Sequence, residues 1–441
     1  MHNDLFQEFS PLSDEDWMQQ ILKDLKGKIP EEKIFSGNQE SIKVAPFYTA
    51  NSVSHVLDES LPHNWITSLE VNLRHGAANN IDDDLKPGLE SLFIRYNDSS
   101  DLIHYLKSQD LRLSNLILLK TGEGNLNLEA IPTSGITSTI ITGRDVFSES
   151  ALLGKYNDKI EESILNELAD PQNGRDIIID LSIYKNAGGN CIIELASMLS
   201  ACNHLIEQFR SRSMNLNSIP ERTSMILACG TEYNMEIAKM RAARVLLANL
   251  YSKQEIQNQA SFLMAKCSEE IMSELDPHTN ILRQTTSTMS AVLGGCDVFI
   301  SKAFNGNDDP FANRISKNIQ LLLKKEGHLD KVANPASGSY FIESLTTELS
   351  EKAWQLFKDM EDLGGFRECL NSGFIKREID KSRSARMENY TSKKEILIGL
   401  NKYLDPAAKI TGKTDSNVES TSPENAITPI NFAQHFEYQD K

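Results

Sequence analysis

Residues 334–366 read NPASGSYFIESLTTELSEKAWQLFKDMEDLGGF, and this stretch predicts a turn, a long helix and a sharp stop. The opening Asn-Pro and Ser-Gly pairs favour a turn, and Ser339 stands where a helix N-cap is expected. Gly364 and Gly365 favour the left-handed conformation that ends a helix. Between them, apolar residues recur at steps of three or four: Ile342, Leu345, Leu349, Ala353, Leu356, Met360 and Leu363. One face of this helix is therefore expected to pack on a core.

The chain before this helix alternates short apolar runs with longer helical stretches. Apolar residues on both faces of each run indicate strands of a parallel sheet that helices cover. The predicted strands are 66–73, 89–95, 116–119, 138–142, 176–182, 224–229, 260–265 and 297–301. Eight such units fit an α/β fold of the (β/α)8 barrel type.

The remaining pattern divides the chain into four parts. Residues 1–50 form an N-terminal arm, 51–305 the barrel, 306–410 a helical extension packed on the barrel, and 411–441 a flexible tail rich in Thr, Ser, Asn, Asp and Pro. Asp276 is placed to cap a helix that begins at Pro277. Further helices are predicted at 196–209, 235–250, 312–325 and 366 to about 400.

Composition excludes several classes of function. A net charge of −17 argues against a nucleic-acid partner. No run of eighteen apolar residues predicts a membrane span, and the polar first residues do not resemble a secretory signal, so a cytoplasmic location is expected. The six cysteines are scattered without a C-x-x-C pair, so we expect small buried residues and neither a disulfide framework nor a metal site.

Reactive groups of a barrel enzyme lie at the carboxyl ends of its strands. Tyr184, Lys185 and Asn186 follow the fifth strand and precede two glycines at a helix start, where free N–H groups can hold an anion. Lys185 is a candidate phosphate contact or, if desolvated, a nucleophile. The alternative is a polar loop without chemistry. The lysines and arginines of 376–394 are interleaved with acids, which favours a solvated helix face over an anion site.

Residues 334–366 also resemble the N-P/D-P-A-x-G-S-Y…A-W-x-x-F…G-G signature of the methylmalonyl-CoA mutase family. Residues 235–244, MEIAKMRAAR, resemble that family's E-I-A-K-x-R-A-x-R helix, and 314–320, RISKNIQ, its R-I-A-R-N-T-Q helix. The cations of 235–244 are expected to pair with neighbouring carboxylates. The resemblance implies a (β/α)8 barrel that takes part in the adenosylcobalamin-dependent interconversion of methylmalonyl-CoA and succinyl-CoA.

The chain departs from the family's catalytic pattern at the barrel mouth. After the fifth strand, catalytic members have Gly-Tyr-His-Met-x-Glu-Ala-Gly-Ala, whereas residues 184–188 read YKNAG and contain no histidine. Catalytic members have Gln-Thr-Ser-Gly-Trp where this chain has KCSEE at 266–270, and the acidic pair is expected to repel an anionic acyl-CoA. The vestigial mouth positions are therefore Tyr184, Lys185, Asn186, Lys266, Glu269 and Glu270.

Two further motifs are missing. The Arg-Gly and Arg-Pro-Trp motifs of the family's CoA channel are not recognisable between residues 62 and 76, and no histidine has the Asp-x-His-x-x-Gly context of the cobalamin module. The resemblance thus implies no catalytic, cofactor or metal residue on this chain. It implies adenosylcobalamin on a partner large subunit, acyl-CoA bound only through the complex, and an N-terminal arm that wraps the partner.

These observations predict the small, non-catalytic subunit of a heterodimeric methylmalonyl-CoA mutase. The first alternative is a catalytically competent acyl-CoA mutase barrel whose cobalamin domain lies on a separate chain; this requires an open, polar barrel mouth. The second is a stand-alone scaffold, or an unrelated barrel enzyme that forms a Schiff base at Lys185.

Overall fold

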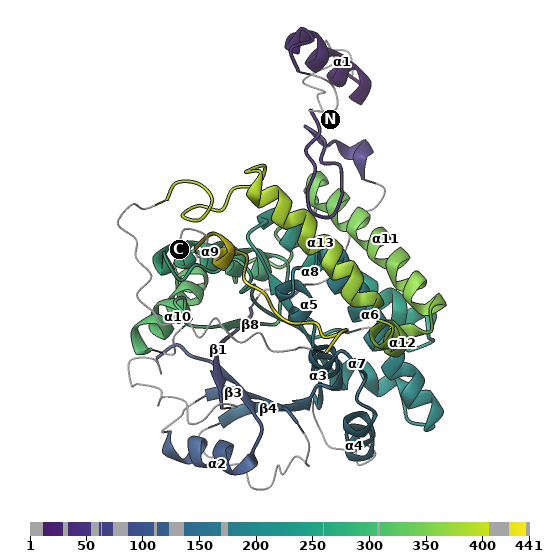
Figure 1. Ribbon diagram of the computed structural model, residues 1–441, viewed down its shortest axis with the longest axis vertical. Coiled ribbons are helices and arrows are strands. Elements are labelled where there is room, and N and C mark those ends of the chain that lie inside the picture. Colours follow the sequence, from purple (N-terminus) through teal and green to yellow (C-terminus); the bar gives the residue numbers. More distant parts are fainter. Residues whose placement is uncertain are drawn as a thin grey trace, which may run out of the picture.

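The computed structural model contains a closed barrel of eight parallel strands surrounded by helices (Figure 1). The structure describes residues 12–29, 34–53, 61–62, 64–73, 87–109, 113–122, 136–168, 175–258, 260–306, 309–404 and 423–437. The barrel closes in chain order, with β1 hydrogen-bonded to both β2 and β8. The predicted (β/α)8 architecture is therefore confirmed.

All eight predicted strands exist, each within a few residues of its expected bounds. They are β1 (Ile66–Asn72), β2 (Ser91–Tyr96), β3 (Leu113–Lys120), β4 (Ile136–Arg144), β5 (Ile177–Asp180), β6 (Thr223–Cys229), β7 (Leu263–Cys267) and β8 (Val298–Ser301). Side chains alternate between the barrel interior and the helical shell. Apolar side chains fill the interior at mid-height: Phe93, Ile117, Leu119, Ile141, Ile178, Ile226, Met264, Val298 and Ile300.

In the described ranges, helices follow β2, β4, β5, β6, β7 and β8 and form the segments outside the barrel. They are α1 (Asp14–Leu25), α2 (Ser99–Ser108), α3 (Val146–Leu153), α4 (Asp158–Leu168), α5 (Ser182–Asn186), α6 (Cys191–Ser211), α7 (Ile219–Arg222), α8 (Tyr233–Lys253), α9 (Pro277–Leu293), α10 (Pro310–Lys325), α11 (Tyr340–Asp362), α12 (Gly365–Asn371), α13 (Phe374–Thr391) and α14 (Phe432–Glu437), with short 3-10 turns η2 (Ala50–Ser52) and η4 (Leu216–Ser218). None of the helices in these described ranges is long and apolar enough to cross a membrane.

The helix that dominates the sequence pattern, α11, packs across α6 and α8 on one side of the barrel (Figure 1). Its predicted apolar face is buried at Ile342, Leu345, Leu349, Ala353 and Met360, whereas Leu356 is half-buried and Leu363, at the end of the helix, is exposed. Gly364 and Gly365 have φ angles of 106° and 78°, as the predicted stop requires. Ser339 is the N-cap residue, but its side chain makes no capping bond; the Glu343 carboxylate instead accepts a hydrogen bond from the Gly338 N–H at 3.1 Å.

The N-terminal arm extends from the barrel, and α1 lies at its far end (Figure 1). No residue of α1 is buried, and the Trp17 side chain is 53% exposed, with its ring 5.4 Å from that of Phe47 in the same arm. The inner part of the arm is anchored instead: Ile42 is buried in the main core, and the Tyr48 ring lies 5.1 Å from the Phe341 ring on α11.

Two predictions about the C-terminal part are wrong. The helix expected from 366 to about 400 is split at Gly373, which has a φ of 72°, and α13 ends at Thr391. The tail expected from 411 is not flexible throughout, because 423–437 is packed on the barrel, with Ile427, Phe432 and Ala433 buried. The segment is mostly polar, so the sequence did not indicate that its few well-spaced apolar residues pack on the barrel. Of the predicted tail, residues 411–422 and 438–441 lie outside the described part of the chain.

Candidate functional site at the barrel mouth

A layer of buried ion pairs crosses the barrel where its strands end. Arg95 on β2 bonds the carboxylates of Glu70 on β1, at 2.8 Å, and Asp180 on β5, at 2.5 Å. Lys266 on β7 lies 3.5 Å from the same Asp180 carboxylate. Each of these side chains is at most 10% exposed. Arg95, Asp180 and Lys266 each follow an apolar interior residue by two positions, so strand alternation aims them into the barrel. Glu70 follows Ser68 by two positions and reaches the same layer through its bond to Arg95.

The charges of this layer compensate one another. Burial alone would raise the pKa of Glu70, but Arg95 and nearby lysines lower it to about 2. Burial acts in the same way on Asp180, where Lys266 and Arg95 prevail and hold the pKa below its usual range. Because burying an ion is costly unless it is paired, this layer is a matched set of two acids and two bases. It lies at the end of the barrel where barrel enzymes carry their active sites.

The residues after β7 form a second set of contacts at the mouth. The Asn186 side-chain oxygen accepts hydrogen bonds from the Ser268 hydroxyl at 3.1 Å and the Glu269 N–H at 2.9 Å. Glu269 pairs with Lys302 at 2.7 Å, and Glu270 forms two bonds of 2.5 and 2.7 Å to the Arg386 guanidinium. Both acids of the pair are thus neutralised by cations. The expected repulsion of an anionic acyl-CoA does not follow from this arrangement.

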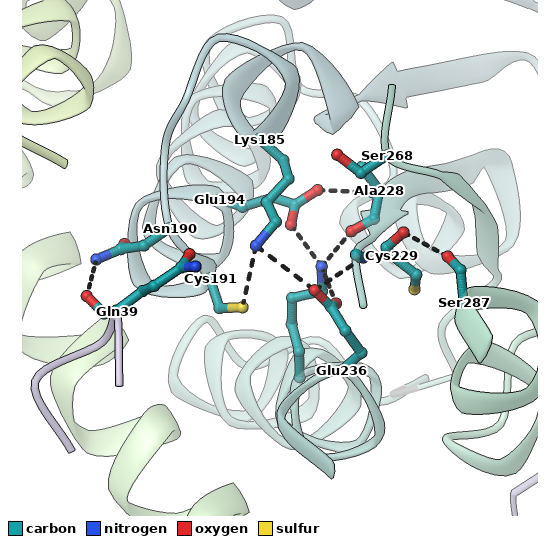
Figure 2. A network of polar contacts seen from close by, with 12 residues as sticks. Gln39, Lys185, Asn190, Cys191, Glu194, Ala228, Cys229, Glu236, Ser268 and Ser287 are labelled. Carbon is teal, nitrogen blue, oxygen red and sulfur yellow. Dashed lines mark hydrogen bonds and ion pairs between the residues drawn. The ribbon is translucent and has the colours of Figure 1, made fainter. Parts of the chain in front are cut away.

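The predicted anion site after β5 is occupied by the chain itself. Lys185 lies on the short helix α5 and points toward the Glu236 carboxylate, at 3.5 Å, and the Cys191 sulfur, at 4.0 Å (Figure 2). At the start of α6, the Cys191 N–H donates to the Glu40 carboxylate of the N-terminal arm at 3.3 Å. The helix N-terminus therefore already binds an anion, and that anion is internal.

Lys185 is not set up as a nucleophile. Although burial lowers the pKa of its amine, neighbouring groups, with Glu236 the nearest carboxylate, hold the pKa above its ordinary value. The amine remains protonated and cannot attack a carbonyl. Tyr184 beside it is fully buried, and its hydroxyl has no hydrogen-bond partner within the described ranges. Burial and then Asp145 and Asp180 raise the pKa of this hydroxyl.

A buried lysine ties the mouth to the helical shell. The Lys239 amine on α8 bonds Glu194 on α6 at 2.8 Å and Glu236 at 2.6 Å, with no side chain of the three accessible to solvent. Figure 2 shows Glu194 and Glu236 turned toward the end of β6, where Glu194 accepts the Ala228 N–H at 2.8 Å. Burial raises the pKa of Glu194, whereas at Glu236 the two lysines outweigh burial and lower it. The predicted pairing of the cations in 235–244 is confirmed.

Sequence reasoning singled out Lys266, Asn186 and the acidic pair but missed their partners. Glu70, Arg95 and Asp180 could have been found, because each is a charged residue at an interior position near the end of an apolar strand. Arg386 could not, since it sits among exposed charges on α13 and only the three-dimensional structure shows it buried. Within the described residues, no group of three metal-ligating side chains is arranged to hold a metal ion.

Fold and mouth together define a (β/α)8 barrel protein whose strand ends are tied by internal ion pairs. The methylmalonyl-CoA mutase family model matches residues 167–427. The chain belongs to the methylmalonyl-CoA mutase family.

Three relatives describe its place in that family. The chain is 27% identical to the methylmalonyl-CoA mutase small subunit of Porphyromonas gingivalis, with 98% of this chain and 76% of that protein aligned. It is 34% identical to the methylmalonyl-CoA mutase of Rhizobium meliloti over 51% of this chain and 33% of that protein, and 30% identical to that of Cereibacter sphaeroides over 66% and 42%. The chain thus aligns with less than half the length of the last two.

Proposed function

We propose that this chain is the small, non-catalytic subunit of a heterodimeric, adenosylcobalamin-dependent methylmalonyl-CoA mutase. The observation that carries the proposal is the layer of Glu70, Arg95, Asp180 and Lys266, whose charges are buried and paired with one another at the end of the barrel where a substrate would bind. The near full-length similarity to the Porphyromonas gingivalis small subunit supports the same role. The partner large subunit would carry out the interconversion of methylmalonyl-CoA and succinyl-CoA, in the cytoplasm.

Adenosylcobalamin does not fit the mouth of this chain. A large planar ligand needs an open face, and here Arg95 and its partners are buried while residues 423–437 lie against the loops that follow β4, β5 and β7. We therefore assign the cofactor and the acyl-CoA to the partner and derive no step through either group on this chain.

The N-terminal arm is the proposed contact with the large subunit. An amphipathic helix with no buried residue exposes its apolar face in the isolated chain, and such a face is stabilised when another surface covers it. The arm's anchored inner part, through Glu40 and Tyr48, would fix where that helix projects.

The test is mutase activity with adenosylcobalamin and methylmalonyl-CoA, measured for this chain alone, for a candidate large subunit alone and for the co-expressed pair. We expect activity only in samples that contain the large subunit, and a single 1:1 complex on size exclusion. Turnover by this chain supplied only with a free cobalamin-binding domain would overturn the proposal and favour a competent barrel with its cobalamin domain on a separate chain.

A further inference from the structure

Residues at the barrel mouth bind the chain's own C-terminal segment. We call residues 423–437 the C-terminal strap. Its backbone N–H groups donate to carbonyls on three successive parts of the mouth: Ile427 to Ala151 at 2.8 Å, Ile430 to Asn186 at 2.8 Å and Phe432 to Glu270 at 2.6 Å. The yellow segment in Figure 1 follows this path. The strap therefore joins the loops after β4, β5 and β7.

One aromatic residue anchors the strap. Phe432 is fully buried, with its ring 4.7 Å from the Arg386 guanidinium and 5.4 Å from the Tyr390 ring. The same guanidinium also binds the Glu270 carboxylate. Arg386 therefore fixes the side chain of Glu270, whose backbone carbonyl accepts the Phe432 N–H, and covers the Phe432 ring as well.

The far end of the strap is held by a carboxylate. One oxygen of Glu437 accepts hydrogen bonds from the Ser273 hydroxyl at 2.6 Å and from the Leu275 N–H at 2.9 Å. Asn431 donates from its side-chain amide to the Met272 carbonyl at 2.8 Å. These contacts continue along the loop after β7.

The mouth has the features of a built peptide groove. Asn186 presents its carbonyl to the strap while Ser268 and Glu269 fix its side chain. Gly154 has a φ of 66°, and a Cβ there would lie 2.3 Å from the Ala426 nitrogen, so the strap approaches closely only because this residue is glycine. Backbone hydrogen bonds and an aromatic anchor are the ordinary means of binding an extended peptide.

We propose that the barrel mouth is a peptide-binding groove whose ligand is the C-terminal strap. The backbone carbonyls of Asn186 and Glu270 accept hydrogen bonds from the strap, and the Arg386 guanidinium packs on the Phe432 ring. The proposal goes beyond the subunit role and needs no large subunit, so the two can fail separately.

Hydrogen exchange on the full-length chain tests it, with Phe432→Ala as the variant and Thr428→Ala, at an exposed strap position, as the control. Slow exchange is expected in 424–433 of the wild type. In F432A, exchange should rise about tenfold or more together in 424–433, 183–187 and 268–275, while T428A leaves these segments unchanged. Exchange of the wild-type strap at the rate of a free peptide, or release of the strap without any change at the mouth, would overturn the proposal.

A binding experiment tests the groove directly. A fluorescein-labelled peptide of residues 423–437 is titrated into full-length wild type and full-length F432A, followed by anisotropy. Because the groove of the wild type is filled, we expect the F432A chain to bind the peptide at least about tenfold more tightly. A second peptide that carries the Phe432→Ala change should bind neither chain. Equal affinity of both chains for both peptides would contradict a specific groove, and circular dichroism reports whether F432A is folded.

Discussion

Arg386 and Glu270 form a buried two-bond ion pair that joins positions 116 residues apart. Arg386 lies on α13 in the helical extension, and Glu270 lies on the loop after β7, so the pair fastens the extension to the barrel mouth. Neither side chain is more than 4% exposed. A bidentate guanidinium–carboxylate pair satisfies both ions with fixed geometry, which a lysine in place of Arg386 could not reproduce.

Replacing Arg386 by alanine should lower the free energy of unfolding by about 3–5 kcal/mol, because it leaves the Glu270 carboxylate buried without a partner. The matched control is Lys381→Ala on the same helix, whose side chain is 72% exposed and pairs with Glu378. An exposed pair of this kind should cost about 0–1 kcal/mol. Urea denaturation of both variants gives the comparison, and equal losses would show that burial of the Arg386 pair is unimportant.

A second variant tests the lysine between Glu194 and Glu236. Lys239→Met removes the amine that bonds both carboxylates and should destabilise the chain by about 3–5 kcal/mol at neutral pH. Without that amine the folded-state pKa of each acid rises, so the native state binds more protons than the unfolded state. Stability of the variant relative to wild type should therefore recover as the pH falls.

The control for this variant is Lys253→Met at the exposed end of the same helix. Its unfolding midpoint should match that of the wild type across the pH range. If the loss of unfolding free energy in Lys239→Met does not become smaller toward acidic pH, unpaired carboxylates are not its cause.

Sequence alone predicted the barrel because its signals are local. Each strand is a short apolar run, and the Asp276-Pro277 start of α9 and the Gly364-Gly365 stop of α11 are chemical signals that need no distant partner. The capping bond that the Thr279 N–H donates to the Asp276 carboxylate and the buried face of α11 confirm these interpretations.

The site was less predictable because its partners come from distant parts of the chain. Asn186 was recognised as a mouth residue, but its bonds to Ser268 and Glu269 depend on the distance between the ends of β5 and β7, which lie on either side of β6. The role of Phe432 could not be recognised from its polar neighbours, and a few buried residues, Phe432 and Ile427 among them, pack a segment expected to be flexible.

A third prediction concerns pH. Burial, and then the carboxylate of Glu40, raise the pKa of Glu232 from 4.5 to about 7, with Lys185 opposing and Glu236 and Glu395 adding to the shift. A carboxyl whose folded pKa is raised keeps its proton in the native state, so its contribution to stability is lost as the pH rises from about 4.5 through 7. Docking of the arm, which carries Glu40, should weaken over this window.

Glu232→Gln removes the titrating group but keeps the shape. Relative to wild type, the variant should gain about 1–3 kcal/mol of stability between pH 5 and pH 8, measured by urea denaturation at each pH. Glu351→Gln, at an exposed position on α11, is the control, and its stability relative to wild type should not change with pH. If the stability of Glu232→Gln relative to wild type is also independent of pH, Glu232 is already ionised in the folded chain.

The last prediction concerns the proposed partner contact on α1. Trp17 is 53% exposed, and Ile21 follows one helical turn later on the same face. If the large subunit covers this face, Trp17→Ser should weaken the complex about tenfold or more, since buried tryptophans often contribute 2 kcal/mol or more at interfaces. Because Trp17 is exposed in the isolated chain, the same change should leave the urea midpoint of that chain almost unaltered. Gln19→Ser, on the opposite face of α1, is the control for binding by surface plasmon resonance or co-purification. If Trp17→Ser and Gln19→Ser bind the large subunit as tightly as the wild type does, the contact lies elsewhere than on α1, and the exposed apolar face of that helix requires another explanation.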